Sequence, residues 1–267
     1  MIRDITIGQY YPADSILHRL DPRVKFVSTM VYIVSLFVFS SWFGYGVAAL
    51  FLIAVIALSK VPFKFMVKGL KPVMMLLLIT MFFNLIFTPG EMIWSFWVIK
   101  ITREGVQLAL RMGIHLVFLI IGASLMTLTT TPNQLTDGLE RLMRPLNKIH
   151  VPVHEIAMMM SIALRFIPIL LEETDKIMKA QMARGADFES GNLIQKVKNM
   201  VPLLVPLFVS AFRRANDLAM AMEARCYHGG DGRTQMKPLA YAGRDYAAYA
   251  VVFGYLAVSI VFRIAGI

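Results

Sequence analysis

The stretch GVQLALRMGIHLVFLIIGASLMTL, residues 105–128, contains Arg111 as its only Lys, Arg, Asp or Glu side chain. A helix that crosses a bilayer needs about 20 predominantly apolar residues, so this stretch predicts a transmembrane helix. Four further segments have a similar character and approach that length: residues 24–40, 42–58, 72–88 and 246–265. The sequence therefore predicts an all-α membrane protein with about five transmembrane helices.

The composition of the whole chain agrees with a membrane protein. The 267 residues are 57% hydrophobic and 16% charged, and the mean hydropathy is +0.63. These values exclude an ordinary soluble domain and a disordered chain. The net charge of +10 first indicates basic residues gathered on one membrane side, so nucleic acid is not expected as a partner and the lipid bilayer is. The single cysteine, Cys226, excludes an internal disulfide framework.

The distribution of basic residues predicts the topology. The N-terminus lacks the apolar core of a signal peptide and is expected in the cytoplasm. Five spans then leave residues 1–23, 59–71 and 129–245 inside, and these hold 23 of the 27 Lys and Arg residues when Lys25 at the boundary is counted. Because positive charge favours the cytoplasmic side, we expect a multi-pass protein of the cell membrane with an extracellular C-terminus.

The region between the last two spans is too long for a connection. We therefore divide the chain into residues 1–128, with the N-terminal segment and four transmembrane helices, residues 129–245, a cytoplasmic domain, and residues 246–267, the last transmembrane helix. Apolar runs at 156–171 and 200–212 are short and contain prolines. We interpret both runs as parts of long amphipathic helices at the cytoplasmic face of the membrane.

Each of these apolar runs continues into a charged stretch with a similar end. The first reads LLEETDKIMKAQMARGADF (170–188) and the second VSAFRRANDLAMAMEARCYHGG (209–230). Aligning Arg184 with Arg225, 41 residues later, matches several further positions: Glu172-Glu173 with Arg213-Arg214, Ala180 with Ala221, and Ala183 with Ala224. This pattern predicts an internal duplication of a long helix that ends in Ala-Arg-small.

Two interpretations of these arginines are open. Each can be a cation that stabilises a helix C-terminus, which contributes about 0.3–1 kcal/mol. Alternatively, each helix projects a guanidinium, flanked by small residues, into an acidic groove of another protein, because the guanidinium fork can bind a carboxylate bidentately. Two copies at two similar helix ends favour the second interpretation and suggest two similar partner sites.

The chain resembles the transmembrane T component of energy-coupling factor (ECF) transporters, which import vitamins and metal ions in prokaryotes. The resemblance covers the whole chain. It includes the opening IGQYYPADSILHRLDPRVKF (7–26), the five spans, the large insertion before the last span and two short signatures: Ala183-Arg184-Gly185 and Ala224-Arg225-Cys226. Cys226 stands where the family commonly has Gly, which weakens the expectation of a left-handed helix cap there.

The resemblance implies a non-catalytic scaffold and the partners that it serves. In that family the insertion forms coupling helices, and each signature arginine docks into one of two ABC-type ATPase subunits. Carried over, Arg184 and Arg225 are the docking residues, and their flanks are Ala183, Gly185, Ala224 and Cys226. A third partner would be one substrate-binding S component. ATP would be bound by the ATPases, so no cofactor is expected in this chain.

Other patterns narrow the function further. The chain has no P-loop pattern, so we do not expect it to bind ATP or to have a catalytic site. No Asp or Glu lies inside the five predicted spans, which argues against proton-relay pumps and cation channels. His150 and His154 have a metal-ligand spacing, but no third ligand is evident and Pro152 between them suggests a helix start. No metal site is therefore expected.

Two further hypotheses concern contacts within the membrane region and with the S component. Asn84, Arg111 and His115 lie at matched depth, and we expect them to form a polar cluster. Methionines are frequent in 151–225, and a deformable Met surface suits a scaffold that serves several partners. Core filling is the simpler explanation of such methionines, and our alternative hypothesis is that Met158, Met159 and Met160 contact the S component.

Two alternative functions remain open. The first is a permease subunit of another ABC importer that itself lines the substrate path. The second is a membrane anchor or assembly factor with no transport role.

Overall fold

A computed structural model describes residues 10–38, 41–96, 99–188, 192–230, 236 and 238–265. The chain folds into two compact units. The transmembrane unit extends up to residue 138 and resumes at 239, and the hairpin unit comprises residues 139–238. The assignment of residues 129–245 to the cytoplasm stays a prediction.

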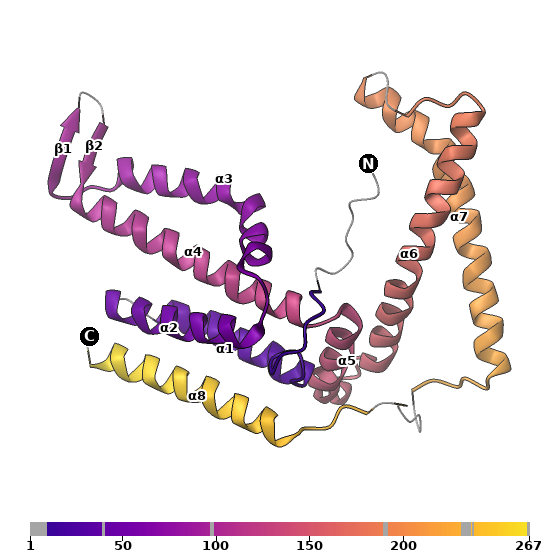
Figure 1. Ribbon diagram of the computed structural model, residues 1–267. Coiled ribbons are helices and arrows are strands. Elements are labelled where there is room, and N and C mark those ends of the chain that lie inside the picture. The colour runs from indigo at the N-terminus through magenta and orange to yellow at the C-terminus, as the bar shows by residue number, and fades with distance from the viewer. Residues whose placement is uncertain are drawn as a thin grey trace. The chain divides into compact units, whose positions relative to one another are not determined.

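The transmembrane unit contains five long helices and one short hairpin (Figure 1). The helices are α1 (Pro22–Val38), α2 (Trp42–Ser59), α3 (Phe63–Phe87), α4 (Arg103–Thr129) and α8 (Gly243–Ile264), and the strands are β1 (Met92–Phe96) and β2 (Ile99–Thr102). Helix α4 packs against α1, α2 and α3, and α1 also packs against α8. The prediction of an all-α membrane protein is confirmed.

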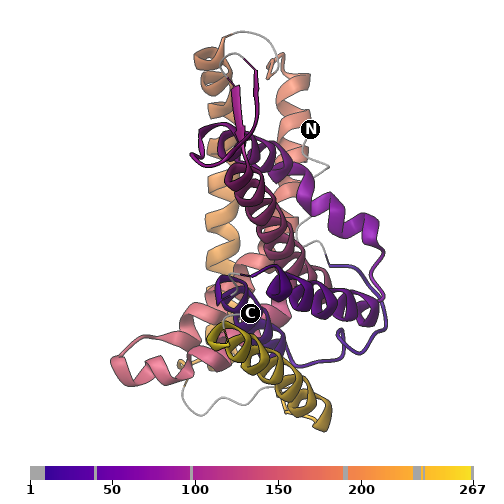
Figure 2. The same ribbon diagram turned by 90° about the vertical axis from the view of Figure 1, so that its left-hand side faces the viewer.

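The amphipathic helix α5 (Pro132–Met143) follows α4, and a 3-10 helix (Arg144–Ile149) follows α5. The hairpin unit is dominated by α6 (Val153–Ala183) and α7 (Leu193–Ala224). The two helices contact each other. In Figure 1 they diverge toward the start of α6 and the end of α7, and Figure 2 shows them after a 90° turn.

Five described helices are long and apolar enough to cross a membrane: α2, α3, α4, α6 and α8. The number agrees with the sequence prediction, but one member differs. The described part of the first predicted span is α1, which has 17 residues. In its place stands α6, because its helix extends through Pro168 to 31 residues. The expectation that the 156–171 run is too short to span was therefore wrong on length and composition.

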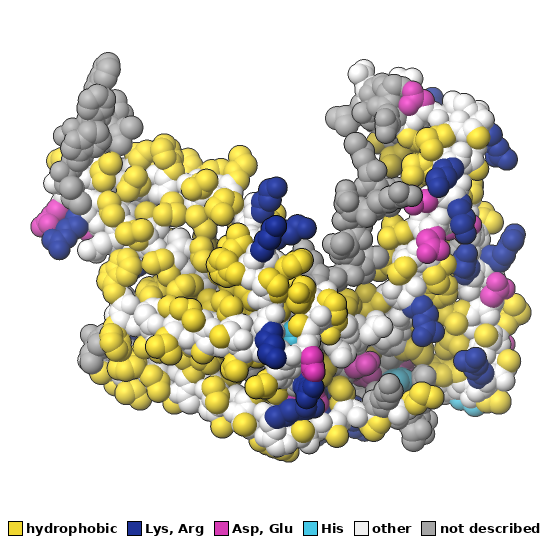
Figure 3. All heavy atoms as spheres, viewed as in Figure 1, with side chains coloured by type: hydrophobic (Ala, Val, Ile, Leu, Met, Phe, Trp, Pro, Cys, Tyr) yellow, Lys and Arg dark blue, Asp and Glu magenta, His cyan; other side chains and the backbone are white. Residues whose placement is uncertain are grey.

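The start of α3 also differs from the prediction. We expected residues 59–71 to be a cytoplasmic loop, but α3 begins at Phe63 and includes Lys64, Lys68 and Lys71. Pro72 lies inside this helix, which bends in Figure 1. A proline removes one helical hydrogen bond and commonly produces such a bend. In Figure 3 hydrophobic side chains cover α3 and α4, while Lys and Arg side chains gather near the start of α3.

The strands β1 and β2 form an antiparallel hairpin between α3 and α4, with Ser95 paired to Lys100. Thr102 joins the hairpin to the helices. Its hydroxyl donates to the Thr88 carbonyl at 2.8 Å and accepts from the Gly105 N–H at 3.1 Å, which caps α4.

The core of the transmembrane unit lies where α1, α2, α4 and α8 meet. Tyr32, Phe51 and Tyr255 stack, with 4.2 Å between the Phe51 and Tyr255 ring centroids. Gly122 on α4 lies against Tyr32, and a Cβ at this glycine would be 2.4 Å from the Tyr32 ring. This position therefore requires glycine, because the tyrosine occupies the space of a side chain.

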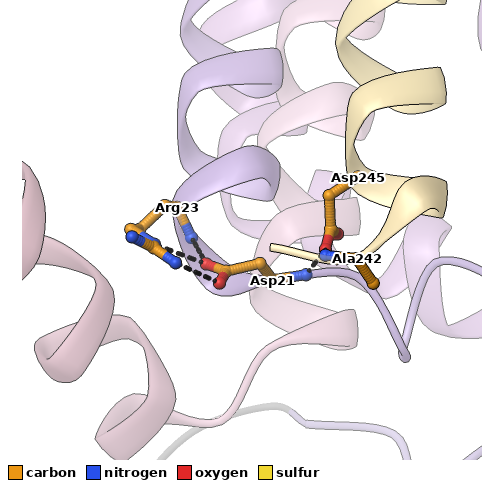
Figure 4. A network of polar contacts seen from close by, with 4 residues as sticks. All are labelled: Asp21, Arg23, Ala242 and Asp245. Carbon is orange, nitrogen blue, oxygen red and sulfur yellow. Dashed lines mark hydrogen bonds and ion pairs between the residues drawn. The ribbon is translucent and has the colours of Figure 1, made fainter. Parts of the chain in front are cut away.

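A buried polar network joins the starts of α1 and α8 (Figure 4). Asp21 caps α1 by accepting the Arg23 N–H at 2.9 Å, and its carboxylate also receives the Arg23 guanidinium at 2.7 and 3.0 Å. Asp245, which is 1% exposed, accepts the backbone N–H groups of Asp21 at 2.9 Å and Ala242 at 2.8 Å. One carboxylate thus ties two chain segments 224 residues apart.

The end of α4 is fastened to the same region. The Lys25 ammonium, 6% exposed, donates to the Thr129 carbonyl at 2.8 Å and to the His18 carbonyl at 3.2 Å. Arg23 also lies over the Tyr241 ring, with its Cζ 3.9 Å from the ring centroid. The starts of α1 and α8 and the end of α4 therefore lie at one end of the transmembrane unit. The sequence reading assigned Asp21 and Asp245 no role, although Asp-Pro before an apolar run is a helix-start signal.

Candidate functional site

Helices α6 and α7 form an antiparallel hairpin. The Gln181 amide donates to the Pro202 carbonyl at 3.4 Å, the Asn199 amide donates to the Asp187 carbonyl at 2.7 Å, and Arg214 pairs with Glu173 at 3.1 Å. The helices have 31 and 32 residues and continue through three internal prolines: Pro168, Pro202 and Pro206. At 1.5 Å per residue each helix is about 47 Å long.

The ends of α6 and α7 have the same backbone hydrogen bonds. At the first end, the N–H groups of Arg184 and Ala186 both donate to the Gln181 carbonyl, and Gly185 donates to Met182. At the second end the donors Arg225, Cys226 and Tyr227 repeat this scheme toward Met222 and Glu223, 41 residues later in every case. This arrangement is the Schellman motif. The duplication predicted from the sequence is therefore present in the backbone.

The backbone angles of the two ends also match. Arg184 and Arg225 have φ of −90° and −93°, and the next residues, Gly185 and Cys226, have positive φ of 88° and 55°. A left-handed conformation costs a residue with a Cβ about 1 kcal/mol more than glycine. We expected the cysteine to disfavour this cap, yet Cys226 adopts it. Gly229, with φ of 103°, lies beyond the helix end.

All six predicted site residues are exposed: Ala183, Arg184, Gly185, Ala224, Arg225 and Cys226. Neither Arg184 nor Arg225 forms an ion pair or side-chain hydrogen bond with the described part of the chain. Their flanking side chains are too small to cover them. Each guanidinium therefore keeps its donors available for an outside acceptor such as a carboxylate.

The two arginines lie at opposite ends of the hairpin. Arg184 follows Glu173 by eleven residues and Arg225 follows Arg214 by eleven residues, while Glu173 and Arg214 pair across the antiparallel helices. Arg184 and Arg225 are thus about 33 Å apart along the helix direction. The structure does not bring them together into one site, so any partners that bind them contact two separate places.

The second end has an additional attachment. The segment after Arg225 leads to Gly230, where a Cβ would be 2.5 Å from His154 Cδ2. His154 lies in the first turn of α6, and its Nδ1 is 2.8 Å from the Glu140 carboxylate of α5. At the first end, a Cβ at Gly185 would meet nothing within 4 Å. The two ends therefore share their caps but differ in their attachment to neighbouring elements.

The two histidines with a metal-ligand spacing, His150 and His154, have other structural roles. His150 has a positive φ of 62° and ends the 3-10 helix, and His154 pairs with Glu140. The described residues contain no group of three or more potential His, Cys, Asp or Glu ligands. The sequence reading missed the contact between His154 and Gly230, for which the Gly229-Gly230 pair was the only signal.

The predicted methionines lie at the start of α6. Met159 and Met160 are 58% and 44% exposed, and Met158 is half-buried. This end of α6 is remote from Arg184. An exposed apolar stripe with helical spacing also follows α7: Val197, Val201, Leu204, Val205, Phe208 and Phe212. Such a stripe is typical of a face that packs against a membrane or another helix.

The predicted cluster of Asn84, Arg111 and His115 was wrong. Arg111 and His115 face α1 and α2, where they contact the rings of Trp42, Phe37 and Tyr45. The Asn84 side chain has no hydrogen bond to either of them in the described part of the chain. A matched depth on α3 and α4 was insufficient to predict a contact, because the side chains of Arg111 and His115 point toward α1 and α2 and not toward α3.

Comparison with known proteins gives consistent matches. The family model CbiQ, described as cobalt transport protein, matches residues 13–236, which include both helix ends. An energy-coupling factor transporter transmembrane protein EcfT of Clostridium kluyveri is 58% identical over 268 residues, covering 99% of this chain and 98% of that protein. Proteins with the same name from Acidaminococcus fermentans and Bacillus subtilis are 53% and 48% identical over 245 and 246 residues. The alignments cover 92% of this chain in both cases, and 91% and 93% of those proteins.

Proposed function

This chain belongs to the family of ECF transporter transmembrane (T) components, and from that membership we propose that it links two cytoplasmic ATPase subunits to a substrate-binding membrane subunit. The transport that it serves is ATP-driven uptake of vitamins or similar micronutrients. The observation that carries the proposal is the pair of exposed arginines at two helix ends with identical caps. A duplicated docking end suits two similar partners.

In this proposal Arg184 docks into one ATPase and Arg225 into the other. Each guanidinium would bind a carboxylate in a groove of its partner, and the small flanks let the groove approach the helix end. The caps support this function because they hold each arginine at a fixed angle to a long helix. The separation of about 33 Å along the helices leaves room for two separate protein subunits.

The exposed apolar surfaces are proposed to bind the substrate-binding subunit. The stripe on α7 and the exposed Met159 and Met160 on α6 offer apolar area that a membrane subunit would cover. Methionine side chains adapt to different shapes, which suits a scaffold that serves more than one partner. Movement of the ATPases at the two arginines would be carried along rigid helices to this surface, where the bound subunit reorients and releases its cargo.

We further propose that the hairpin of α6 and α7 lies at the cytoplasmic face, and that α1 spans the membrane. Helix α7 runs antiparallel beside α6, so a crossing α6 would take α7 with it, and α7 is not among the described helices apolar enough to cross. Crossing would also place the Glu173–Arg214 pair in hydrocarbon, which is costly. Helix α1, in contrast, packs beside α4 and α8 in the transmembrane unit.

The proposed orientation rests on charge. The starts of α1, α3 and α8 carry a group of basic residues: Arg23, Lys25, Lys64, Lys68, Lys71 and Arg244. The opposite ends of the helices carry fewer, so the positive-inside rule places the first group in the cytoplasm and the β1–β2 hairpin outside. As a scaffold, the chain itself is proposed to be non-catalytic, and ATP is bound and hydrolysed by its partners.

Co-purification in mild detergent tests the proposed function. Two ATPases together with a small apolar membrane protein would support it. Two ATPases with a soluble binding protein would instead support a permease subunit of another ABC importer. Recovery without any ATPase would support a membrane anchor or assembly factor, and the proposal would be abandoned.

The exposed Cys226, next to Arg225, allows a more local test. A short thiol-reactive crosslinker on Cys226 should reach one ATPase. In the Cys226→Gly, Gly185→Cys double variant the cysteine moves to the equivalent position beside Arg184, and the crosslink should again reach an ATPase. Crosslinks from either position that stay within this chain would contradict docking at that end.

A further inference from the structure

Two polar side chains of α4 have buried nitrogen atoms without a protein acceptor. Arg111 Nε and His115 Nε2 are buried, and neither has a hydrogen-bond partner in the described part of the chain. They lie one helical turn apart, so both can face the same neighbours. The Arg111 Cζ is 5.6 Å from the centroid of the Trp42 ring, and the His115 ring lies 4.8 Å from Phe37. A buried guanidinium N–H without an acceptor, such as that of Arg111 Nε, is costly, which suggests an absent acceptor.

The depth of Arg111 follows from its neighbours. Trp42 is the first residue of α2, and Phe37 lies in the last turn of α1. Arg111 is eight residues inside α4 but is level with the connection between α1 and α2, so about 12 Å of α4 extends beyond that level. Tryptophan and tyrosine mark the headgroup depth of a bilayer. Trp42 and Tyr45 therefore place the Arg111 guanidinium near lipid headgroups.

The described part of the transmembrane unit provides no countercharge at this level. No Asp or Glu is present in α1, α2 or α3. Two acidic residues near the start of α4 are engaged elsewhere: Glu104 accepts the Glu91 N–H at 2.8 Å, and Glu91, which precedes β1, lies 3.9 Å from Arg103. The other basic residue at the same end of α1, Arg263, donates to the Val38 carbonyl at 3.3 Å. At this end of the helices, Arg111 is thus the basic residue that has a buried donor without an acceptor among the described residues.

We propose that Arg111 and His115 form a binding site for the phosphate of a phospholipid, in the leaflet beside the β1–β2 hairpin. The phosphate accepts from the Arg111 guanidinium and, in the tautomer that carries the proton there, from His115 Nε2. Because Arg111 Nε and His115 Nε2 are buried, both side chains turn toward the phosphate when it binds. Trp42 lies under the guanidinium and holds its plane by a cation–π contact. A phosphate is the anion that a bilayer supplies at this depth, so the site needs no acidic side chain from the protein.

The fluorescence of Trp42 can report lipid binding at this site. In a Trp94→Phe, Trp97→Phe background Trp42 is the only tryptophan, since the chain has three. Titration of the full-length protein in detergent with dioctanoyl phosphatidylglycerol should change the Trp42 fluorescence with saturation. Arg111→Gln should weaken binding by about tenfold or more, the loss of one charge-assisted hydrogen bond. Arg111→Lys keeps the charge without the Nε donor and should bind several-fold more weakly than the unsubstituted protein.

Arg263→Gln is the matched control, because it removes one positive charge at the same end of the helices and should leave binding unchanged. Equal binding by Arg111→Gln, or equal weakening by Arg263→Gln, would overturn the proposal. Inorganic phosphate distinguishes the source of the anion. Competition by a few millimolar phosphate would show a site for free anions and would overturn the lipid assignment, whereas absence of competition supports it.

Discussion

Glu173 and Arg214 occupy equivalent positions in the two copies of the repeat, 41 residues apart, and they pair with each other at 3.1 Å. Equivalent positions of two antiparallel copies meet only where a local twofold axis passes between them. The two members of every other aligned pair of residues, including Arg184 and Arg225, therefore lie on opposite sides of this ion pair. Two proposed docking ends related in this way are suited to two similar subunits that are themselves related by a twofold axis.

Substitutions at this pair should show a measurable but small coupling. The side chains of Arg214 and Glu173 are 38% and 25% exposed, so solvent screens the attraction and we expect a coupling energy of about 0.5–1 kcal/mol. Unfolding measurements on Glu173→Gln, Arg214→Gln and the double variant form the required cycle. Strict additivity of the two single effects would show that the pair does not contribute to the stability of the hairpin.

Substitutions of the two residues with left-handed backbone conformations should change the stability in opposite directions at the two helix ends. Cys226 has φ of 55° and Gly185 has φ of 88°. Cys226→Gly should stabilise the protein by about 1 kcal/mol, because glycine adopts this conformation without strain, and Gly185→Ala should destabilise it by a similar amount. Thermal unfolding of both variants checks this. A lower melting temperature for Cys226→Gly would show that the cysteine makes a contact that outweighs its strain.

The attachment of the second helix end predicts a steric effect at Gly230. In Gly230→Ala the new Cβ would lie 2.5 Å from the His154 ring, so we expect residues 226–230 to detach and the stability to fall by about 1–3 kcal/mol. Hydrogen exchange of the backbone amides in 226–230 should accelerate. Gly254→Ala on α8 is the control, because nothing lies within 4 Å of its Cβ. Unchanged exchange in Gly230→Ala would refute the attachment.

The polar network at the starts of α1 and α8 predicts a pH effect. Burial raises the pKa of Asp21, but the hydrogen bonds from the Arg23 side chain and backbone outweigh it, so the pKa lies below the ordinary value of 3.8. A carboxylate with a lowered pKa stabilises the folded state at pH above 3.8, and this contribution is lost as the pH falls through the lowered value. The melting temperature should therefore fall steeply below pH 3.8.

Asp21→Asn should reduce that low-pH loss and destabilise the protein by about 3 kcal/mol at neutral pH, because Arg23 loses a largely buried partner. Asp14→Asn is the control. Its partner Arg19 is exposed, so little change is expected. Equal effects of the two substitutions would show that the Asp21 network does not fix the starts of α1 and α8.

Much of this fold was readable from the sequence because its signals are local. Long apolar runs and the Ala-Arg-small ends predicted the helices, including the two long helices α6 and α7, and the six exposed residues at the ends of these two. The count of five membrane-competent helices was also met, but the sequence did not show that α6 continues through Pro168 or that α3 begins as early as Phe63. A proline lowers helix propensity without ending a helix that packing supports.

The contacts between distant segments were not readable. Asp245 binds Asp21 across 224 residues, and Gly230 packs on His154, and neither pairing leaves a periodic signal. Arg111 was assigned to a neighbour on α3, whereas it contacts Trp42 of α2. A single sequence gives the depth of a residue in a span but not the direction in which it points around the helix.

The central claim, that Arg184 and Arg225 dock the two ATPases, is tested most directly by measuring how much of each ATPase co-purifies with charge-reversed variants in mild detergent. We predict that Arg184→Glu and Arg225→Glu each lower the ATPase yield and that the double variant loses both, since breaking an interfacial charge pair costs about 2–5 kcal/mol. Arg213→Glu, an equal charge change at an exposed residue of α7, should keep the unsubstituted yield. A double variant that retains both ATPases at that yield would contradict the account.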